Sequence, residues 1–342
     1  MTEKLALDIQ NLSVSYKTDT AVVKAVNDLT FQLKTGQTLG LVGETGAGKT
    51  TTALAIMGLL PEPVGSVDSG KIIQEEVDLL KLPEKEMRKL RGNQISMIFQ
   101  DPMTSLNPVM KVGNQIAECF IKHQDLNKKE ALIEAGKMLE MVGISAKRAG
   151  DYPHQFSGGM KQRVIIAIAL ACNPHLLIAD EPTTALDVTI QAQVLDLMKR
   201  LRKDYKTSLL MITHDLGVVA DICDEVAIMY AGRIVEKGNL EDIFDNFKHP
   251  YTEGLFNSLP DVENRHEPLR PIKGLMPDPT NLPAGCSFFP RCPYAKSECE
   301  KNLPSLSQLN DSHYVACLAY EDKYKNLFDF KLMADVQRRA EK

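Results

Sequence analysis

The strongest constraint on the fold is a glycine-rich loop that lies between an apolar segment and a segment of helical composition. Residues 43–50 are Gly-Glu-Thr-Gly-Ala-Gly-Lys-Thr, preceded by Leu39–Val42 and followed by helical residues up to position 60. Glycines here let backbone N–H groups turn inward around phosphates, and the positive end of the following helix points at them. We expect Lys49 to reach the β- and γ-phosphates of a nucleotide and Thr50 to hold Mg²⁺. A chance glycine-rich turn is the alternative, and the two flanking elements argue against it.

Two neighbouring carboxylates follow a second apolar segment. Leu176–Ala179 is continuously apolar, as expected for a parallel strand that is buried on both faces. Asp180 would lie at the carboxyl end of this strand, where ligands bind in open α/β sheets, and we expect it to hold Mg²⁺ directly or through water. Glu181 is placed to accept a proton from an attacking water. A surface Asp-Glu pair that caps a turn is the alternative, and the phosphate loop favours the functional interpretation.

A second anion-binding helix start is predicted at Ser157-Gly158-Gly159, before the helical segment 160–171. Serine is a good N-cap, and two glycines let the backbone approach an anion closely. Since the chain already has one phosphate loop, the simplest interpretation is that this start serves the nucleotide of another subunit. An ordinary capped helix is the alternative.

Length and composition set further limits. The chain has 342 residues with 40 basic and 45 acidic side chains, so it lacks the basic excess of a nucleic-acid-binding protein. The N-terminus has no apolar core of a signal peptide, and the longest apolar run, Val164–Cys172, is far shorter than the ~20 residues of a membrane span. We therefore expect a cytosolic protein that reaches a membrane only through partners.

Residues 1–258 are predicted to form one α/β unit, and residues 259–342 an irregular C-terminal appendage. Nine of the 18 prolines lie between residues 259 and 304, a density that neither a parallel sheet nor a long helix accommodates. Within the first unit, alternating apolar residues near the N-terminus predict antiparallel strands, and residues 100–172 are predicted to be mostly helical. The last residues, 322–342, have the composition of a charged helix.

Four cysteines cluster in the appendage, at Cys286, Cys292, Cys299 and Cys317. In a cytosolic chain such clustering favours a metal site over disulfides. The gaps are longer than the ~2–4 residues of paired zinc ligands, and a Cys-Pro step also occurs in iron–sulfur sequences. We predict a [4Fe–4S] cluster, with Zn²⁺, free thiols or a disulfide as alternatives and His313 as an alternative ligand.

Taken together, the motifs resemble those of the ATP-binding cassette (ABC) family over residues ~5–258. The resemblance implies ATP and Mg²⁺ as ligands, and a P-loop NTPase core with an antiparallel β subdomain, a helical signature subdomain and an irregular C-terminal appendage. Met160 and Phe156 depart from the usual signature, which has glutamine and leucine there, but the serine and glycines remain. For nucleotide binding, the resemblance assigns Gly43, Glu44, Thr45, Gly46, Ala47, Gly48, Lys49 and Thr50 of the Walker A motif, the next residue Thr51, Tyr16 on adenine, Ser157, Gly158 and Gly159 of the signature, and Asp187 of the D-loop. It assigns Thr50, Gln100 and Asp180 to Mg²⁺. For catalysis it assigns Glu181, His214 and Gln100.

A closer resemblance is to the ATPases of oligopeptide/dipeptide importers, and it covers almost the whole chain. It rests on segments 99–108, 154–160, 249–252, 282–286 and 291–293. The resemblance implies an ATP-hydrolysing subunit that powers peptide import from the cytoplasmic face of the cell membrane. It also implies a second homologous ATPase subunit, of which this chain would be the first of the pair, two transmembrane permease subunits and an extracytoplasmic substrate-binding protein. Nickel and other solutes are the alternatives to peptides. A soluble ABC protein acting on ribosomes or DNA, or a phosphate-loop kinase or GTPase, is the alternative function.

Overall fold

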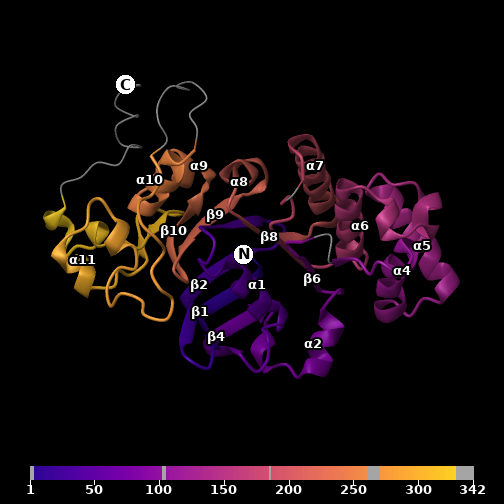
Figure 1. The fold of residues 1–342 in the computed structure, drawn as a ribbon, viewed down its shortest axis with the longest axis horizontal. Coiled ribbons are helices and arrows are strands. Elements are labelled where there is room, and N and C mark those ends of the chain that lie inside the picture. Colours follow the sequence, from indigo (N-terminus) through magenta and orange to yellow (C-terminus); the bar gives the residue numbers. More distant parts are fainter. Residues whose placement is uncertain (1–3, 102–104, 185, 260–269, 329–342) are drawn as a thin grey trace.

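Two β-sheets, flanked by helices, form the centre of the protein (Figure 1). The computed structural model describes residues 4–101, 105–184, 186–259 and 270–328. The smaller sheet is antiparallel and has the strand order β2-β1-β4-β5, which confirms the antiparallel N-terminal strands expected from alternation. Its strands are β1 (Leu5–Lys17), β2 (Val22–Lys34), β4 (Gly65–Gln74) and β5 (Val77–Asp78).

The larger sheet has the order β11-β12-β10-β9-β3-β8-β7-β6. Strands β9, β3, β8, β7 and β6 are parallel to one another, whereas β10, β12 and β11 continue the sheet in antiparallel fashion. The bounds of these strands are β3 (Thr38–Val42), β6 (Ile95–Ile98), β7 (Leu176–Asp180), β8 (Ser208–Thr213), β9 (Glu225–Tyr230), β10 (Arg233–Asn239), β11 (Ser307–Gln308) and β12 (Tyr314–Val315).

The central strands are apolar throughout because both faces of the larger sheet are covered. In β7, Leu176 and Ile178 belong to the core shared with the antiparallel sheet and helix α1 (Lys49–Met57). Leu177 and Ala179 point to the opposite face and belong to a second core. Successive side chains of a strand point to opposite faces, so a strand between two cores has no polar face.

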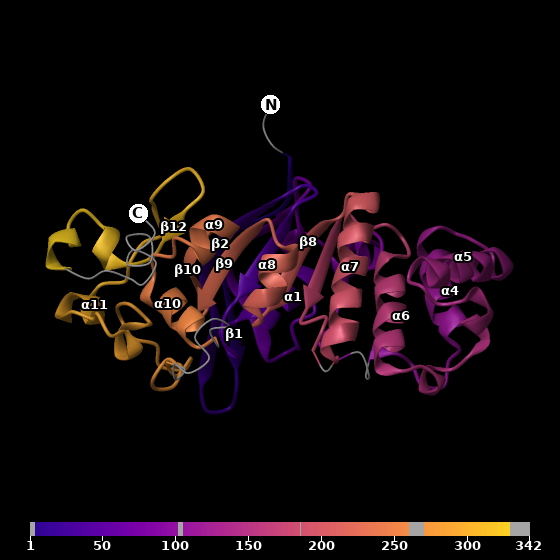
Figure 2. The same cartoon turned by 90° about the horizontal axis from the view of Figure 1, so that it is seen from above.

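The second core is covered by helices α8 (Leu216–Ile222), α7 (Val188–Tyr205) and α6 (Gly158–Leu170), with α4 (Val112–His123) and α5 (Lys128–Met141) beyond them. Figure 2 shows α7 and α6 side by side and α4 and α5 at the far end of the molecule. Helix α5 begins with a reciprocal cap between Asn127 and Glu130. This arrangement confirms that most of the 100–172 region is helical. A short helix, α2 (Glu84–Leu90), precedes β6.

Residues 270–328 form an irregular segment, as the prolines predict, at the opposite end of the molecule from α4 and α5 (Figure 1). We call these residues the C-terminal extension. Its short elements are η4 (Phe289–Arg291), α11 (Ser297–Lys301), β11, β12, η5 (Leu318–Tyr320) and η6 (Lys325–Leu327), and it follows α9 (Leu240–Phe244) and α10 (Pro250–Asn257). Strand β12 pairs with β10, so the extension is part of the main sheet. The charged helix expected near the end lies largely outside the described residues.

The prediction of an iron–sulfur cluster at Cys286, Cys292, Cys299 and Cys317 is wrong. The part of the chain that the structure describes contains no group of three or more His, Cys, Asp or Glu residues that could hold a metal ion. The four cysteines line a small cavity together with apolar side chains. Burial raises the pKa of Cys286 to about 11 and the pKa of both Cys292 and Cys317 to about 12. The absence of such a metal-holding group also leaves the zinc alternative without a site among the described residues.

His313, expected as an alternative metal ligand, instead binds a buried carboxylate. Its Nε2 lies 2.7 Å from Oε1 of Glu236 in β10, a residue with no exposed surface. The same carboxylate accepts hydrogen bonds from the backbone N–H groups of Lys248 and His249, at 2.5 and 3.0 Å. This carboxylate therefore connects β10, the segment before α10 and the C-terminal extension.

We expect Glu236→Ala to lower the free energy of unfolding by roughly 3 kcal/mol, because it leaves buried N–H donors without an acceptor. Urea titration of the full chain measures this change. The control is Glu225→Ala in β9, whose partly exposed carboxylate pairs with Lys237 and is worth less than about 1 kcal/mol. Equal losses in the two variants would contradict the role assigned to Glu236.

Candidate functional site

The glycine-rich loop connects β3 to α1, and two of its glycines leave no room for a Cβ. A Cβ at Gly43 would lie 2.2 Å from the carbonyl oxygen of Met229. At Gly48, φ is +101° and a Cβ would lie 2.3 Å from the carbonyl oxygen of Ala25. Gly48 also begins α1 without a side-chain cap, which leaves the first N–H groups of the helix open toward an anion.

Lys49 provides a buried positive charge at this helix start, with only 6% of its surface exposed. Its Nζ donates hydrogen bonds to the carbonyl oxygens of Gly43 and Glu44, at 2.7 and 3.1 Å. Burial lowers the pKa of the Lys49 ammonium, and this effect is opposed by the carboxylates of Glu181, Asp180 and Glu44. The loop thus holds the cation beside the N–H groups that would bind phosphates.

The carboxylate of Asp180 fits a magnesium site. Asp180 ends β7, is 2% exposed and accepts a hydrogen bond from Thr50, the residue after Lys49. Burial raises the pKa of its carboxyl, the Thr50 hydrogen bond lowers it, and the charge of Glu181 raises it further. Its Oδ1 has no hydrogen-bond partner among the described residues. A buried oxygen without a partner, beside a hydroxyl, is a suitable ligand for Mg²⁺.

Three side chains hold the carboxylate of Glu181. Nδ1 of His214 lies 2.9 Å from its Oε1, while Nε2 of Gln100 and the hydroxyl of Thr184 donate to Oε2 at 2.9 and 3.0 Å. Burial raises the pKa of Glu181, but the hydrogen bonds from His214 and Thr184 outweigh this effect and leave the pKa lowered. The carboxylate is therefore ionised at neutral pH and able to accept a proton. Sequence reasoning predicted His214 and Gln100 for this site and missed Thr184.

These elements enclose one pocket, lined by Thr45, Gly46 and Gly48–Thr51 with Tyr16, Gln100 and Glu181. The hydroxyl of Tyr16, in β1, lies 3.2 Å from that of Thr51. Tyr16 is thus beside the phosphate loop, where its predicted stacking on adenine stays a prediction. The amide nitrogen of Gln100 donates a hydrogen bond to Glu181. The role of Gln100 as a magnesium ligand therefore also stays a prediction.

The signature residues lie elsewhere. Ser157 caps α6 by accepting a hydrogen bond from the N–H of Met160 at 3.4 Å, and both Ser157 and Gly158 are exposed. A Cβ at Gly159 would lie 2.4 Å from Cγ2 of Ile190 in α7, so close packing requires glycine there. Asp187, which caps α7, is exposed as well. None of these four signature and D-loop residues lines the pocket described above.

Sequence comparison gives the family. A sequence model of the ABC transporter family matches residues 26–184, and one of the oligopeptide/dipeptide transporter C-terminal region matches residues 235–299. The chain is 50% identical to the oligopeptide transport ATP-binding protein AppD of Bacillus subtilis, over 93% of this chain and 97% of that protein. The chain belongs to the oligopeptide/dipeptide family of ABC transporter ATP-binding proteins. This ABC ATPase is also 51% identical to the oligopeptide transport ATP-binding protein OppD of Haemophilus influenzae, over 93% of this chain and 98% of that protein.

Solved structures confirm the fold of an ABC ATPase. The dimeric, post-hydrolysis state of the ATP-binding cassette MJ0796 bound to ADP and Pi has a TM-score of 0.61 and 27% identity, and covers 68% of this chain and 98% of that chain. CbiO1 of Clostridium perfringens, from the ABC transporter complex cbiONQ, has a TM-score of 0.61 and 26% identity, over 71% of this chain and 91% of that chain. In the described ranges of this ABC ATPase, no helix has the length and apolar character needed to cross a bilayer.

Proposed function

We propose that this ABC ATPase powers peptide import and hydrolyses ATP in sites that it shares with a second ATPase subunit. The observation that carries the proposal is the position of Ser157 and Gly158, which begin a helix outside the chain's own pocket. Exposed N–H groups at a helix start bind phosphate, so this start suits the nucleotide held by another cassette. Two such subunits facing each other would close two nucleotides between them.

The pocket supports a mechanism by positioning and electrostatics. Lys49 neutralises the charge of the β- and γ-phosphates. A water oxygen attacks the γ-phosphorus, the bond from this phosphorus to the bridging oxygen of ADP breaks, and Glu181 accepts the water's proton. His214, Gln100 and Thr184 hold the Glu181 carboxylate in place. Thr50 and Asp180 would hold Mg²⁺, which supplies positive charge to the phosphates when bound.

The relatives named for oligopeptide and dipeptide transport support peptides as the solute and a membrane transporter as the assembly. The full assembly then contains two transmembrane permease subunits, an extracytoplasmic substrate-binding protein and a second, different ATPase. This chain is the first ATPase of the pair and lies at the cytoplasmic face of the membrane. The segment 100–108, of which residues 102–104 lie outside the described residues, contacts the permeases.

Purification of the tagged chain from its own membranes tests this assembly. We expect a second cassette and two integral membrane proteins to co-purify, and the reconstituted complex to take up labelled peptide only with ATP. Uptake of Ni²⁺ instead of peptide would refute the assignment of peptides as the transported solute. Recovery with ribosomes or DNA, and without membrane subunits, would refute the importer and favour a soluble ABC protein.

A further inference from the structure

The phosphate loop carries a negative charge of its own at Glu44, and a residue of the C-terminal extension pairs with it. The guanidinium of Arg291 donates to both carboxylate oxygens of Glu44, from Nη1 to Oε2 at 2.9 Å and from Nη2 to Oε1 at 3.2 Å. Only 6% of the Arg291 side chain is exposed. Bidentate pairs of this kind fix geometry as well as charge. Glu44, grouped with the nucleotide-binding residues from sequence, therefore turns its carboxylate toward the extension.

Arg291 is itself held in place by neighbours from two further segments. Its Nε donates to the carbonyl oxygen of Lys273 at 3.1 Å, and its Nη2 lies 3.5 Å from that of Ile272. Its Nη1 lies 3.4 Å from the hydroxyl of Tyr230 at the end of β9. A guanidinium with this many partners has little freedom to leave the carboxylate, so Glu44 is held by a rigid group.

Two further contacts connect the region around the extension to the loop and the pocket. The buried hydroxyl of Tyr251, in α10, accepts a hydrogen bond from the backbone N–H of Glu44 at 2.9 Å. The ring of Tyr251 packs against Phe288 of the extension, with centroids 5.4 Å apart. Pro279 of the extension lines the nucleotide pocket, and its carbonyl oxygen accepts a hydrogen bond from the N–H of Lys24 in β2 at 2.9 Å.

We propose that Arg291 is a positioning residue for the ATP site, which it serves by neutralising Glu44 and fixing the phosphate loop. Without this partner, the Glu44 carboxylate would repel the negative phosphates and attract Lys49, whose Nζ already contacts the Glu44 carbonyl oxygen. The C-terminal extension is then part of the ATP-binding machinery. The proposal deepens the proposed function at the same site, and it depends on neither the solute nor the permeases.

Binding of Mg·ATP to the full-length chain, together with kcat and KM for ATP, tests the proposal. We expect Arg291→Gln to weaken ATP binding about tenfold, within the roughly 2- to 30-fold range of residues that act through a neighbour. The substitution should raise KM for ATP more than it lowers kcat. The loss of affinity should be smaller at high salt, because salt screens charge repulsion. The double variant Glu44→Gln/Arg291→Gln should regain most of the lost affinity, because no unpaired carboxylate remains.

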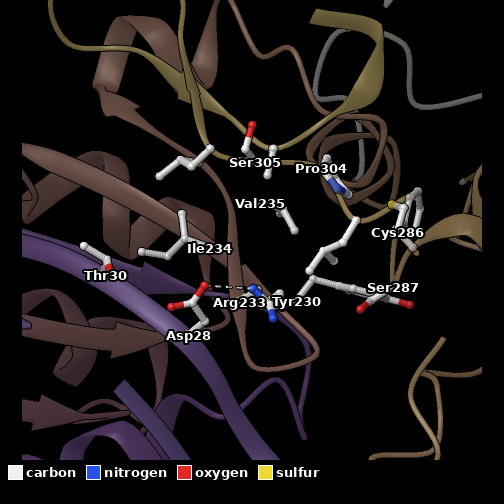
Figure 3. Close-up of a pocket in the computed structure, with 14 residues that line it drawn as sticks. Asp28, Thr30, Tyr230, Arg233, Ile234, Val235, Cys286, Ser287, Pro304 and Ser305 are labelled. Carbon is white, nitrogen blue, oxygen red and sulfur yellow. Dashed lines mark ion pairs between the residues drawn. The ribbon is translucent and has the colours of Figure 1, made fainter. Parts of the chain in front are cut away.

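The matched control is Arg233→Gln. Arg233, in β10, pairs with Asp28 of β2 at 3.5 Å on the wall of a different pocket, between these strands and the C-terminal extension (Figure 3). The ATP affinity of the Arg233→Gln variant should equal that of the unchanged chain. Unchanged affinity in Arg291→Gln would overturn the proposal. So would a folded double variant that binds as weakly as Arg291→Gln, since the loss would then be independent of Glu44. Peptide uptake is absent from these readouts, so failure of the importer assignment would leave them interpretable.

Discussion

Replacing Glu181 by glutamine is expected to slow ATP hydrolysis by about 10²- to 10⁴-fold, the usual contribution of a positioned general base. Glutamine has nearly the same shape and still hydrogen-bonds with its neighbours, but its amide cannot take the proton of the attacking water. Because Lys49 and the glycine loop remain, ATP binding should be retained. A closed, ATP-bound pair of subunits should therefore accumulate.

Single-turnover hydrolysis and equilibrium ATP binding, measured on the same sample, separate these two effects. Glu86→Gln in α2 is a suitable control, because the side chain of this glutamate is 44% exposed and pairs with a surface lysine, Lys89. Hydrolysis at the unchanged rate in Glu181→Gln would remove Glu181 from its role as the base.

The second large effect is expected from Lys49→Ala, which should weaken ATP binding by roughly 10- to 100-fold and slow turnover as well. A hydrogen bond to a charged group contributes about 1.5–3 kcal/mol, and each 1.4 kcal/mol is a factor of ten in affinity. The substitution also removes the bonds from Nζ to the carbonyl oxygens of Gly43 and Glu44.

The affinity of Lys49→Ala is best compared with that of Lys81→Ala, whose side chain is 75% exposed on the surface. Titration with ATP under the same salt conditions measures both. If Lys49→Ala kept full ATPase activity, the phosphate site would have to lie elsewhere in the chain.

Local patterns were sufficient for the parts of the fold and site that depend on neighbouring residues. The apolar run before Asp180 predicted a strand buried on both faces, and Ser157 predicted the start of α6. Loop, strand end and helix start are each fixed by a few adjacent residues. The resemblance to ABC proteins supplied the more distant partners, Gln100 and His214, which the structure brings to Glu181.

Sequence reasoning failed where a side chain pairs with a residue far away in the sequence. Glu44 and Arg291 are 247 positions apart, and His313 finds its partner in Glu236 rather than in a metal. The cysteines are close in sequence, but their spacing does not reveal that they line a small, largely apolar cavity and form no metal-holding group among the described residues. Arg291 was noted from sequence only as part of a family segment, which was the one signal available for its role.

The central claim is that each nucleotide is enclosed by the pocket of one ATPase subunit and the signature helix of the other. Gly158 allows a direct test, because a Cβ there would have no atom of the described residues within 4 Å. Gly150 is equally open and serves as the control. When Glu181→Gln inactivates the site at this chain's own phosphate loop, the hydrolysis that remains in the two-subunit complex occurs at the partner subunit's site.

Hydrolysis at that site is the deciding measurement. Adding Gly158→Leu should reduce the hydrolysis rate at the partner's site at least tenfold, while adding Gly150→Leu should leave that rate unchanged. In both cases, this chain alone should bind ATP normally. Equal hydrolysis with Gly158→Leu and Gly150→Leu would contradict a shared site.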